Sequence, residues 1–254
     1  MTCFGLIGFP LLNSSSPAYF EKKFLKEGLR GYRYDLFPME SIQGLPGLIR
    51  ANPEIRGLNV TIPHKVAVIE LLQELDPVAE AVAAVNTIDV FHSQEKTILK
   101  GYNTDVTGFE QSLIPLLKPF HKRALVLGTG GASRAVSFVL ERLGIPVTFV
   151  SRKPANADQL CYEDVNSEII GRHQLIVQTS PLGKHPDAGT YPSLPYQYLR
   201  TDHLLYDLNY NPGTTRFLQF GAQYGATVKN GLEMLHLQAD ASWNIWRKSQ
   251  KERG

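Results

Sequence analysis

A lysine with polar neighbours is the first candidate for chemistry in this chain. The segment Gly57–Lys65 reads Gly-Leu-Asn-Val-Thr-Ile-Pro-His-Lys, so an apolar strand is predicted to end around Asn59 and Thr61. Pro63 is then expected to open a helix, because proline lacks the N–H that has no partner in a first helical turn. Lys65 would lie at the positive end of that helix dipole, where a cation is disfavoured by about 0.3–1 kcal/mol. This unfavourable position indicates a functional site.

A glycine-rich turn between a predicted strand and a predicted helix is the second candidate. Ala124–Leu127 is a short apolar strand, Gly128-Thr-Gly-Gly131 follows it, and Ala132–Leu143 has helical spacing. Glycines permit a tight turn and let the backbone approach a pyrophosphate, which the helix N-terminus stabilises. Ser133 stands in place of the third glycine of the dinucleotide-binding pattern, so an ordinary glycine turn remains an alternative.

The end of the next predicted strand discriminates between two nucleotides. Folds that bind NAD place an acidic residue about 20 residues after the glycines, on the ribose 2′-hydroxyl. Here Val150 is followed by Ser151, Arg152 and Lys153, without a carboxylate. Arginine can bind a phosphate through two parallel hydrogen bonds, and lysine adds a second cation. The pattern favours NADP over NAD. The alternative is that Arg152 and Lys153 are an ordinary pair of solvated surface residues.

The composition is typical of a soluble globular protein. The chain has 254 residues, of which 43% are hydrophobic and 20% charged, which suits one large domain or two of ordinary size. The net charge is +2 and the basic residues are scattered, so no nucleic-acid partner is expected. Apolar runs stay well short of the roughly 20 residues that span a membrane, so no membrane partner is expected either.

The cysteines, the histidines and the start of the chain bear on compartment and metal content. Cys3 and Cys161 are spaced for neither a zinc site nor a redox pair, so free thiols are expected. The histidines do not fall into a metal-ligand spacing, and no metal is expected. The first residues lack the basic start of a secretory signal. Together these observations predict a cytoplasmic protein.

Strand-like and helix-like segments alternate, which indicates an α/β fold with largely parallel strands. The predicted strands are 2–9, 32–37, 56–62, 86–91, 97–101, 124–127, 147–150, 174–178 and 204–208. The predicted helices are 16–29, 41–51, 63–75, 77–85, 107–117, 132–143, 214–224 and 232–246. Ser16 is the expected N-cap of the first helix. A domain boundary is expected at 102–122, and the last helix is expected to return to the first domain.

Segments spread over nearly the whole chain are similar to the motifs of the shikimate dehydrogenase family. They are Gly8–Pro17, Asn59–Lys65, Ala84–Thr87, Gly101–Asp105, Gly128–Gly131, Thr179–Gly183, Tyr206–Tyr210 and Gly231–Gln238. Each motif alone recurs by chance, whereas the ordered set is specific to the family. The chain departs from the common family pattern at Asn13, Ala84, Lys153 and Glu233.

The resemblance implies an α/β fold of two domains with a cleft between them. Residues 1–103, joined by a C-terminal helix at about 232–254, would form an α/β substrate-binding catalytic domain. Residues 104–231 would form a Rossmann-type NADP-binding domain. The implied enzyme is an oxidoreductase acting on a CH–OH group, which reversibly reduces 3-dehydroshikimate to shikimate with NADPH on the route to chorismate and the aromatic amino acids. A monomer or a homodimer is expected.

The resemblance also assigns a role to each matching residue. Lys65 and Asp105 match the catalytic pair, because an ammonium can stabilise and protonate the alkoxide that hydride transfer creates. The substrate-binding set is Ser14, Ser16, Asn59, Thr61, Lys65, Asn86, Asp105, Tyr210 and Gln238. The NADP(H)-binding set is Gly128, Thr129, Gly130, Gly131, Ala132, Ser151, Arg152, Lys153, Thr179, Leu208, Gly231 and Met234.

Three other interpretations remain open at this point. The nearest is a relative that acts on quinate, or on both substrates, with NADP or NAD; the pattern Ser14-Ser-Ser16 favours shikimate. A folate-type dehydrogenase of similar two-domain build would not explain the loop that contains these serines. A non-catalytic nucleotide sensor would not need both Lys65 and Asp105.

Overall fold

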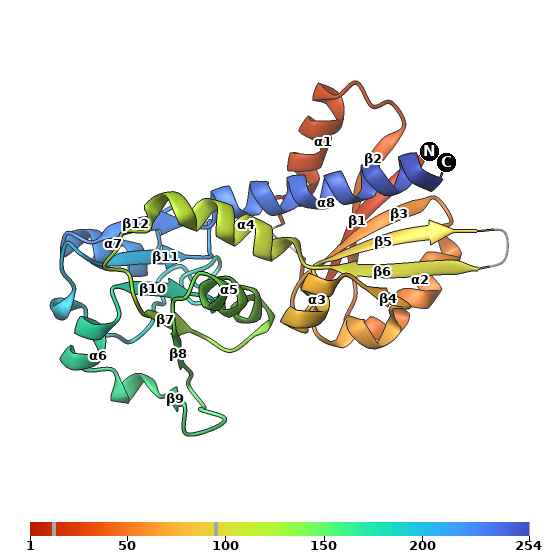
Figure 1. Cartoon of the computed structure of the whole chain (residues 1–254). Helices are drawn as coiled ribbons and strands as arrows, with labels where there is room; N and C mark the ends of the chain where they lie inside the picture. The colour runs from red at the N-terminus through yellow and green to blue at the C-terminus, as the bar shows by residue number, and fades with distance from the viewer. Residues whose placement is uncertain (12–13, 94–95, 254) are drawn as a thin grey trace. The chain divides into compact units, whose positions relative to one another are not determined.

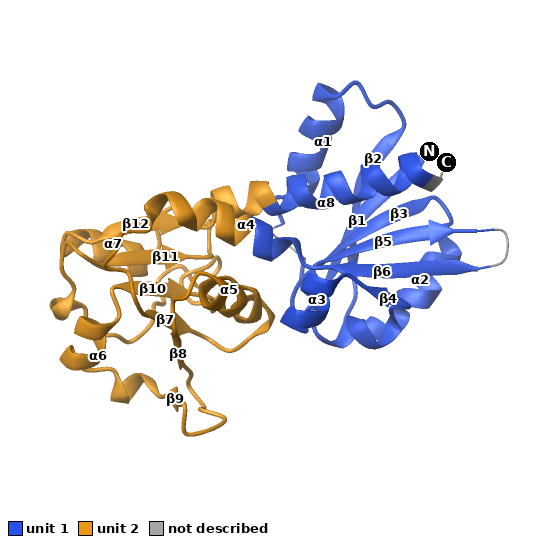
Figure 2. Cartoon of the chain, in the orientation of Figure 1, with its two compact units in different colours: residues 1–107, 238–254 blue, residues 108–237 orange. Residues whose placement is uncertain are grey.

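The computed structural model describes residues 1–11, 14–93 and 96–253 of the chain. The chain folds as two compact units, drawn in different colours in Figure 2. Unit 1 comprises Met1–Thr107 and Gln238–Gly254, and unit 2 comprises Gly108–Leu237. Both limits fall inside a helix, α4 (Thr104–Leu113) and α8 (Leu232–Arg253), a few residues after the predicted limits at 103/104 and 231/232.

Unit 1 contains a mixed sheet whose strands lie in the order β2-β1-β3-β5-β6-β4 (Figure 1). The strands are β1 (Thr2–Gly8), β2 (Tyr32–Pro38), β3 (Ile55–Val60), β4 (Glu74–Leu75), β5 (Thr87–His92) and β6 (Thr97–Tyr102). The helices are α1 (Ser16–Lys26), α2 (Leu45–Ala51) and α3 (Pro77–Val82), with 3-10 helices at Ile42–Gly44 and Ala67–Leu71. β1 is parallel to β2 and β3, whereas β5 is antiparallel to both β3 and β6.

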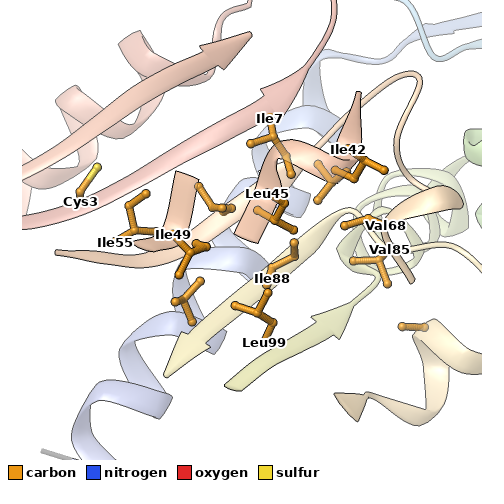
Figure 3. Close-up of a cluster of buried hydrophobic side chains, with 14 residues drawn as sticks. Cys3, Ile7, Ile42, Leu45, Ile49, Ile55, Val68, Val85, Ile88 and Leu99 are labelled. Atoms are coloured by element: carbon orange, nitrogen blue, oxygen red, sulfur yellow. The ribbon is translucent and has the colours of Figure 1, made fainter. Parts of the chain in front are cut away.

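Alternation along β1 supplies two separate cores, because successive side chains of a strand point to opposite faces. Cys3 and Ile7 belong to the cluster drawn in Figure 3, together with Leu45 and Ile49 of α2. Phe4 belongs to a second cluster, with aromatic side chains of α1 and α8. The sheet of unit 1 is therefore buried between two layers of helices.

The aromatic core ties the last helix of the chain to the sheet. Trp243 and Trp246 of α8 are 1% and 0% exposed, and the Phe4 ring stacks on Trp246 with centroids 4.8 Å apart. The indole N–H of Trp246 donates to the Ile88 carbonyl of β5 at 2.9 Å. α8 is thus held by a hydrogen bond as well as by buried rings.

Unit 2 contains a parallel sheet in the order β12-β11-β10-β7-β8-β9. The strands are β7 (Ala124–Leu127), β8 (Val147–Val150), β9 (Gln159–Leu160), β10 (Leu175–Gln178), β11 (Leu204–Asp207) and β12 (Thr227–Asn230). The helices are α5 (Gly131–Arg142), α6 (Ser167–Arg172) and α7 (Arg216–Gln223), with 3-10 helices at Ile114–Leu116, Tyr162–Asp164 and Tyr196–Tyr198. All residues of β7, β10 and β11 are buried, as parallel strands covered on both faces require.

The unit 2 sheet is parallel throughout, and the mixed unit 1 sheet contains the parallel pairs β1–β2, β1–β3 and β4–β6, so the predicted α/β class is confirmed. Within the described part of the chain, no helix combines the length and the apolar character needed to cross a membrane.

The predicted helix at 63–75 is wrong for most of its length. Residues 62–63 and 65–66 form turns, and only Ala67–Leu71 is helical, as a 3-10 helix. The carbonyl of Lys65 accepts a hydrogen bond from the Val85 N–H at 2.7 Å. In an α-helix the same carbonyl would accept from the N–H four residues later in the chain. Lys65 therefore lies before the helical turn, and the expected cost from a helix dipole does not apply to it.

The start of α1 and several short elements also differ from the predictions. Ser15 is the N-cap of α1, and Ser16 is its first residue, so the predicted capping role of Ser16 is wrong. The elements β4, β9, β12 and α6 were not predicted. Two-residue strands such as β4 and β9 are too short to show a hydrophobic period.

Gly57 gives a test of the packing between β3 and α8. A Cβ added at Gly57 would lie 2.2 Å from the indole nitrogen of Trp246, so Gly57→Ala should lower the free energy of unfolding by about 1–3 kcal/mol. In α2, an added Cβ at Gly47 meets nothing within 4 Å, so Gly47→Ala should raise the free energy of unfolding by about 0.5–1 kcal/mol. Denaturant unfolding of both variants checks this pair, and a Gly57→Ala protein as stable as the wild type would contradict the packing.

Candidate functional site

Antiparallel pairing brings the polar residues of unit 1 to one edge of its sheet. Asn59, near the end of β3, pairs with Thr87 at the start of β5, and Thr87 pairs with Tyr102 at the end of β6. The chain then enters α4, whose first turn holds Asp105. Residues far apart in sequence therefore meet where β3 and β6 end and β5 begins.

Lys65 and Asp105 form an ion pair at this edge. The distance from Lys65 Nζ to Asp105 Oδ2 is 2.5 Å, and the two side chains are 15% and 9% exposed. The other carboxylate oxygen, Oδ1, accepts a hydrogen bond from Asn86 Nδ2 at 2.9 Å. Asp105 also lies in the first turn of α4, where unpaired N–H groups favour an anion. The carboxylate is thus fixed on both oxygens, and it holds the lysine ammonium in place.

The orientation of the Asn86 amide follows from its partners. The backbone N–H of Thr104 can only donate, and it lies 2.7 Å from Oδ1 of Asn86. The remaining amide atom is therefore the nitrogen, which faces Asp105 Oδ1 at 2.9 Å and Gln238 Oε1 at 3.3 Å. Asn86 is 3% exposed, so these bonds are made with little water nearby.

Three buried hydroxyls lie behind this amide. They belong to Thr87, Thr104 and Ser242, hereafter the hydroxyl cluster, and their oxygens are 3.1, 2.8 and 3.1 Å apart. Asn59 joins the cluster through its amide nitrogen, 3.0 Å from the oxygen of Ser242. Its amide oxygen accepts a hydrogen bond from the Tyr34 hydroxyl at 2.8 Å. Asn59 is 6% exposed, so both ends of its amide are engaged inside the protein.

The sequence did not single out Tyr34 or the hydroxyl cluster, although it carried a partial signal for the cluster. Thr87 and Thr104 lie within the two motifs that contain Asn86 and Asp105. Ser242 follows Gln238 by four residues, which places it on the same face of α8 one turn later. A serine one turn after Gln238, on the face of α8 that also carries Ala239 and Trp246, was the available clue.

The predicted substrate loop has its own hydrogen bonds in unit 1. The backbone N–H of Ser16 donates to the Ser14 hydroxyl at 3.3 Å. Burial raises the pKa of the Tyr34 phenol, and a hydrogen bond with the Ser16 side chain opposes that rise. Thr61 packs against Gly8, where an added Cβ would lie 2.4 Å from the threonine methyl group. These contacts link the two serines to Tyr34, and through it to Asn59.

The chemistry open to unit 1 is proton transfer and charge stabilisation. Lys65 presents an ammonium that a carboxylate fixes in place, beside the amides of Asn86 and Gln238. An ammonium in such a position can stabilise a developing oxyanion and give it a proton. The amides and hydroxyls suit a small ligand that carries several polar groups.

In unit 2, the predicted cofactor residues follow the ends of parallel strands. Gly128–Gly131 come after β7, Ser151–Lys153 after β8, Thr179 after β10, Leu208 after β11 and Gly231 after β12. Parallel strands end at the same edge of a sheet, so these residues share one edge. β7 lies between β8 and β10, where the strand order reverses, and dinucleotides bind at such switch points.

The glycine loop leaves the N-terminus of α5 open. Gly128 has a φ of +115°, and a Cβ there would lie 2.8 Å from the Thr179 hydroxyl, so glycine is required. At Gly130 an added Cβ meets nothing within 4 Å. The hydroxyl of Ser133 donates to the Gly130 carbonyl at 2.6 Å, and its side chain is buried. The serine that replaces the third glycine therefore does not occupy the space in which a pyrophosphate would bind.

The two cations after β8 are exposed. Arg152 and Lys153 have no carboxylate partner among the residues that the structure describes. The Ser151 hydroxyl accepts a hydrogen bond from the Lys153 N–H at 3.2 Å, which forms a tight turn. Both side chains remain available to a phosphate, and this donor set fits the 2′-phosphate of NADP.

The loops after β10, β11 and β12 are joined by the backbone and side chain of Asn209. The side-chain amide nitrogen of Asn209 donates to the carbonyls of Ser180 and Leu182, each at 3.1 Å. Its backbone carbonyl accepts a hydrogen bond from the Gly231 N–H at 3.0 Å. Gly231 approaches the Leu208 backbone so closely that an added Cβ would lie 2.0 Å from the Leu208 carbonyl oxygen. Asn209 therefore holds the loops that carry Thr179, Leu208 and Gly231, although Asn209 was not among the predicted cofactor residues.

The remaining predicted residues are placed individually. Thr179 donates from its hydroxyl to the Leu127 carbonyl at 2.9 Å, Met234 is 7% exposed in the first turn of α8, and Tyr210 follows β11 in unit 2. The Thr129 side chain is exposed and Ala132 is half-buried.

The four departures from the family pattern leave the Lys65–Asp105 pair intact. Glu233 forms an ion pair with Lys229 of β12, and Ala84 is buried with its carbonyl bonded to the Asn103 amide. Lys153 is exposed, and Asn13 lies outside the described residues. In residues 1–11, 14–93 and 96–253, no group of three or more His, Cys, Asp or Glu side chains is arranged to hold a metal ion.

Comparison with known proteins gives one consistent family. Residues 6–88 match the family described as "Shikimate dehydrogenase substrate binding domain". A shikimate dehydrogenase (NADP(+)) of Caldanaerobacter subterraneus subsp. tengcongensis is 34% identical over 263 residues, which cover 96% of this chain and 90% of the relative.

Solved structures agree with these matches. A shikimate 5-dehydrogenase of Thermus thermophilus, in complex with NADP(H) and shikimate, is similar with a TM-score of 0.83 and 31% identity, over 97% of this chain and 93% of that one. A quinate dehydrogenase of Corynebacterium glutamicum, in complex with NAD, has a TM-score of 0.84 and 25% identity, over 96% and 93% of the two chains. The resemblance inferred from the ordered motifs is thus confirmed.

Asp207, at the end of β11, provides a test of the electrostatics beneath these loops. Burial raises the pKa of its carboxyl to about 6, although the Thr215 hydroxyl and the Asn209 N–H donate to it. The folded state therefore binds a proton more tightly than the unfolded chain. The stability that this carboxyl contributes is fully present well below pH 4 and is lost as pH rises through about 6, which totals about 3 kcal/mol for a shift of this size.

Asp207→Asn lacks this titration, so the comparison isolates it from other carboxyls. The free energy of unfolding of the wild type, minus that of Asp207→Asn, should decrease by about 2 kcal/mol between pH 4 and pH 7. Denaturant unfolding at four pH values measures the difference. A difference that stays constant across this range would contradict the raised pKa.

Proposed function

The chain belongs to the shikimate dehydrogenase family, and from that membership we propose that it reversibly reduces 3-dehydroshikimate to shikimate with NADPH. It is an NADP-dependent oxidoreductase of the route to chorismate and the aromatic amino acids. The observation that carries the proposal is the ion pair of Lys65 with Asp105, held by Asn86 at an edge of the unit 1 sheet.

Lys65 would act at the ketone oxygen of the substrate. The glycine loop and Arg152 of unit 2 would hold NADPH, which would supply a hydride to the ketone carbon as the C=O electron pair moves to oxygen. The ammonium of Lys65 would stabilise the resulting alkoxide and transfer one proton to it from Nζ. Asp105 would keep the ammonium directed at that oxygen, and its carboxylate offsets the positive charge. In the oxidative direction the neutral amine of Lys65 would accept the hydroxyl proton.

Unit 1 would bind the substrate through short polar side chains. We assign the substrate carboxylate to Ser14 and Ser16, and the ring hydroxyls to Thr61, Asn86 and Gln238. For Tyr210, which belongs to unit 2, a substrate contact stays a prediction from the family resemblance. A small ring with several hydroxyls is discriminated by such groups, because a missing partner leaves a buried polar atom unpaired. Asn59 would contribute indirectly, since its amide is engaged with Tyr34 and Ser242.

Unit 2 would bind NADP(H). We assign the pyrophosphate to Gly128–Ala132 at the N-terminus of α5, and the 2′-phosphate to Ser151–Lys153. The nicotinamide would lie near Thr179, Leu208, Gly231 and Met234. Support for this assignment comes from the shared sheet edge, the open space at Gly130 and the exposed cations after β8. The domain limits that we propose stay at 103/104 and 231/232.

Oligomeric state and compartment complete the proposal. We propose a monomer or homodimer in the cytoplasm, without a nucleic-acid or membrane partner. Cys3 and Cys161 are free thiols, which suits a reducing compartment.

Quinate dehydrogenation is the alternative, favoured by the similarity to a quinate dehydrogenase in complex with NAD. Quinate carries an additional hydroxyl near its carboxylate, so the region of Ser14 and Ser16 would have to accommodate it. The absence of an acidic residue directly after β8 argues against NAD.

Initial rates with four substrate pairs decide between these functions. The purified protein is offered shikimate or quinate, each with NADP or NAD, and absorbance of the reduced nicotinamide is followed. Shikimate with NADP should give the highest kcat/KM. A higher value for quinate, or for NAD, would replace the proposed function by the alternative.

Arg152→Ala serves as the control for the cofactor half of this experiment. It should raise the KM for NADP by about tenfold or more, since a charge-assisted hydrogen bond to phosphate is lost, while rates with NAD stay close to those of the wild type. Equal effects on both nucleotides would remove the proposed 2′-phosphate contact.

Lys65→Ala tests the catalytic assignment. It should lower kcat by about 10²–10⁴-fold, because the proton donor is lost, and leave NADP binding within twofold of the wild type. Steady-state kinetics and fluorescence titration with NADPH give the two quantities. Lys100→Ala, which removes a lysine paired with Glu74 in the same unit, is the matched control and should retain activity. Normal turnover in Lys65→Ala would refute the role.

A further inference from the structure

We propose that Ser242 is a positioning residue for the reaction, a role that rests on the proposed function of Lys65 and Asp105. Its hydroxyl holds those of Thr87 and Thr104, and these set the hydrogen bonds of Asn86. Asn86 in turn holds Asp105 beside Lys65. Ser242 thereby supports the catalytic pair through Thr104 and Asn86.

The Asn86 amide nitrogen has fewer protons than acceptors around it. It carries two protons and lies within 3.3 Å of three acceptors, on Thr104, Asp105 and Gln238. Thr104 Oγ1 and Asp105 Oδ1 are both at 2.9 Å. Whether Thr104 Oγ1 accepts from Asn86 depends on where its own proton points, so this hydroxyl affects the bond from Asn86 to Asp105.

Ser242 contacts both other members of the hydroxyl cluster. Its oxygen lies 2.8 Å from Thr87 Oγ1 and 3.1 Å from Thr104 Oγ1, and it donates to the Gln238 carbonyl at 2.9 Å. The amide of Asn59 reaches it from β3 at 3.0 Å. Ser242 thus connects β3, β5 and the start of α4 to α8.

The hydroxyl cluster is buried away from solvent, so water is a poor substitute for a lost partner. Thr87, Thr104 and Ser242 are 0%, 2% and 0% exposed. When solvent has no access, a hydroxyl that loses its partner must find another within the protein. Removal of the Ser242 hydroxyl would therefore make Thr104 and Asn59 redistribute their bonds. Asn86 offers an acceptor to each of them, its Oδ1 at 3.1 Å from Thr104 Oγ1 and its backbone carbonyl at 3.3 Å from Asn59 Nδ2.

The anchorage of Ser242 makes this effect specific. The next residue, Trp243, and Trp246 one turn later are almost fully buried in the aromatic core. The backbone of α8 at Ser242 is therefore fixed, so Ser242→Ala removes one oxygen and leaves the helix in place. The expected consequence is a displaced carboxylate and ammonium in an otherwise folded enzyme.

Four variants test the proposal in the full-length protein. Ser242→Ala and Thr104→Val remove a hydroxyl each, and Thr104→Ser retains one. Ser112→Ala is the matched control, because Ser112 is also buried, 1% exposed, and bonds to the Tyr206 hydroxyl at 2.7 Å in unit 2. For each variant kcat, the KM for shikimate, the NADPH dissociation constant and the thermal midpoint are measured.

Ser242→Ala and Thr104→Val should lower kcat by about 10- to 100-fold with NADPH affinity within twofold, since displacement of catalytic groups by an ångström costs rates of this order. Thr104→Ser should retain kcat within about threefold, and Ser112→Ala should change only the thermal midpoint. A purely structural role would lower the midpoint of Ser242→Ala and leave kcat of the folded fraction unchanged.

Unchanged kcat in Ser242→Ala, or equal losses in Thr104→Ser and Thr104→Val, would overturn the inference. If Ser242→Ala does not fold, the comparison of the two Thr104 variants decides. A wild-type protein without shikimate turnover would instead refute the proposed function, so the two failures are distinguishable.

Discussion

The ion pair between Lys65 and Asp105 is the interaction on which the polar architecture of unit 1 depends. Two charges that are 15% and 9% exposed have lost most of their hydration, and their attraction offsets that loss only when further hydrogen bonds fix them. The amide of Asn86 supplies one such bond, and the first turn of α4 favours the same carboxylate. Removal of either charge would leave the other unbalanced at a largely dry site, so the pair constrains its surroundings as much as they constrain it.

The two sheets bring their motifs together by different means. In unit 2, each motif follows the end of a strand. The five strands concerned are parallel, so all these motifs meet at one edge of the sheet. In unit 1, β5 runs against β3 and β6, and residues that precede a strand meet residues that follow one. Short motifs separated by 20 to 150 residues therefore become neighbours in both units, for example Asn86 with Asp105 and with Gln238.

Sequence alone predicted the α/β class, the family and the residues of the Lys65 ion pair, because these depend on periodicity and on local motifs. It failed at the segment after Pro63, where the Lys65 carbonyl bonds to Val85 rather than within a helix. Helix propensity depends on residues that are close along the chain. It therefore cannot predict that the Lys65 carbonyl will bond to Val85, 20 residues later. Ser242 was overlooked for a related reason: a serine in a helix is ordinary until the fold buries it against two threonines.

The return of α8 to unit 1 has a consequence for biosynthesis. Unit 2 is one continuous segment, Gly108–Leu237, whereas unit 1 needs residues from both ends of the chain. The ribosome therefore delivers all of unit 2 before it delivers Ser242, Trp243 and Trp246. Until those residues emerge, the Phe4 side of the first sheet and the hydroxyls of Thr87 and Thr104 lack their cover. Unit 1 is thus the first unit whose synthesis begins and the last to be completed. Until then its aromatic face is exposed and could bind a chaperone.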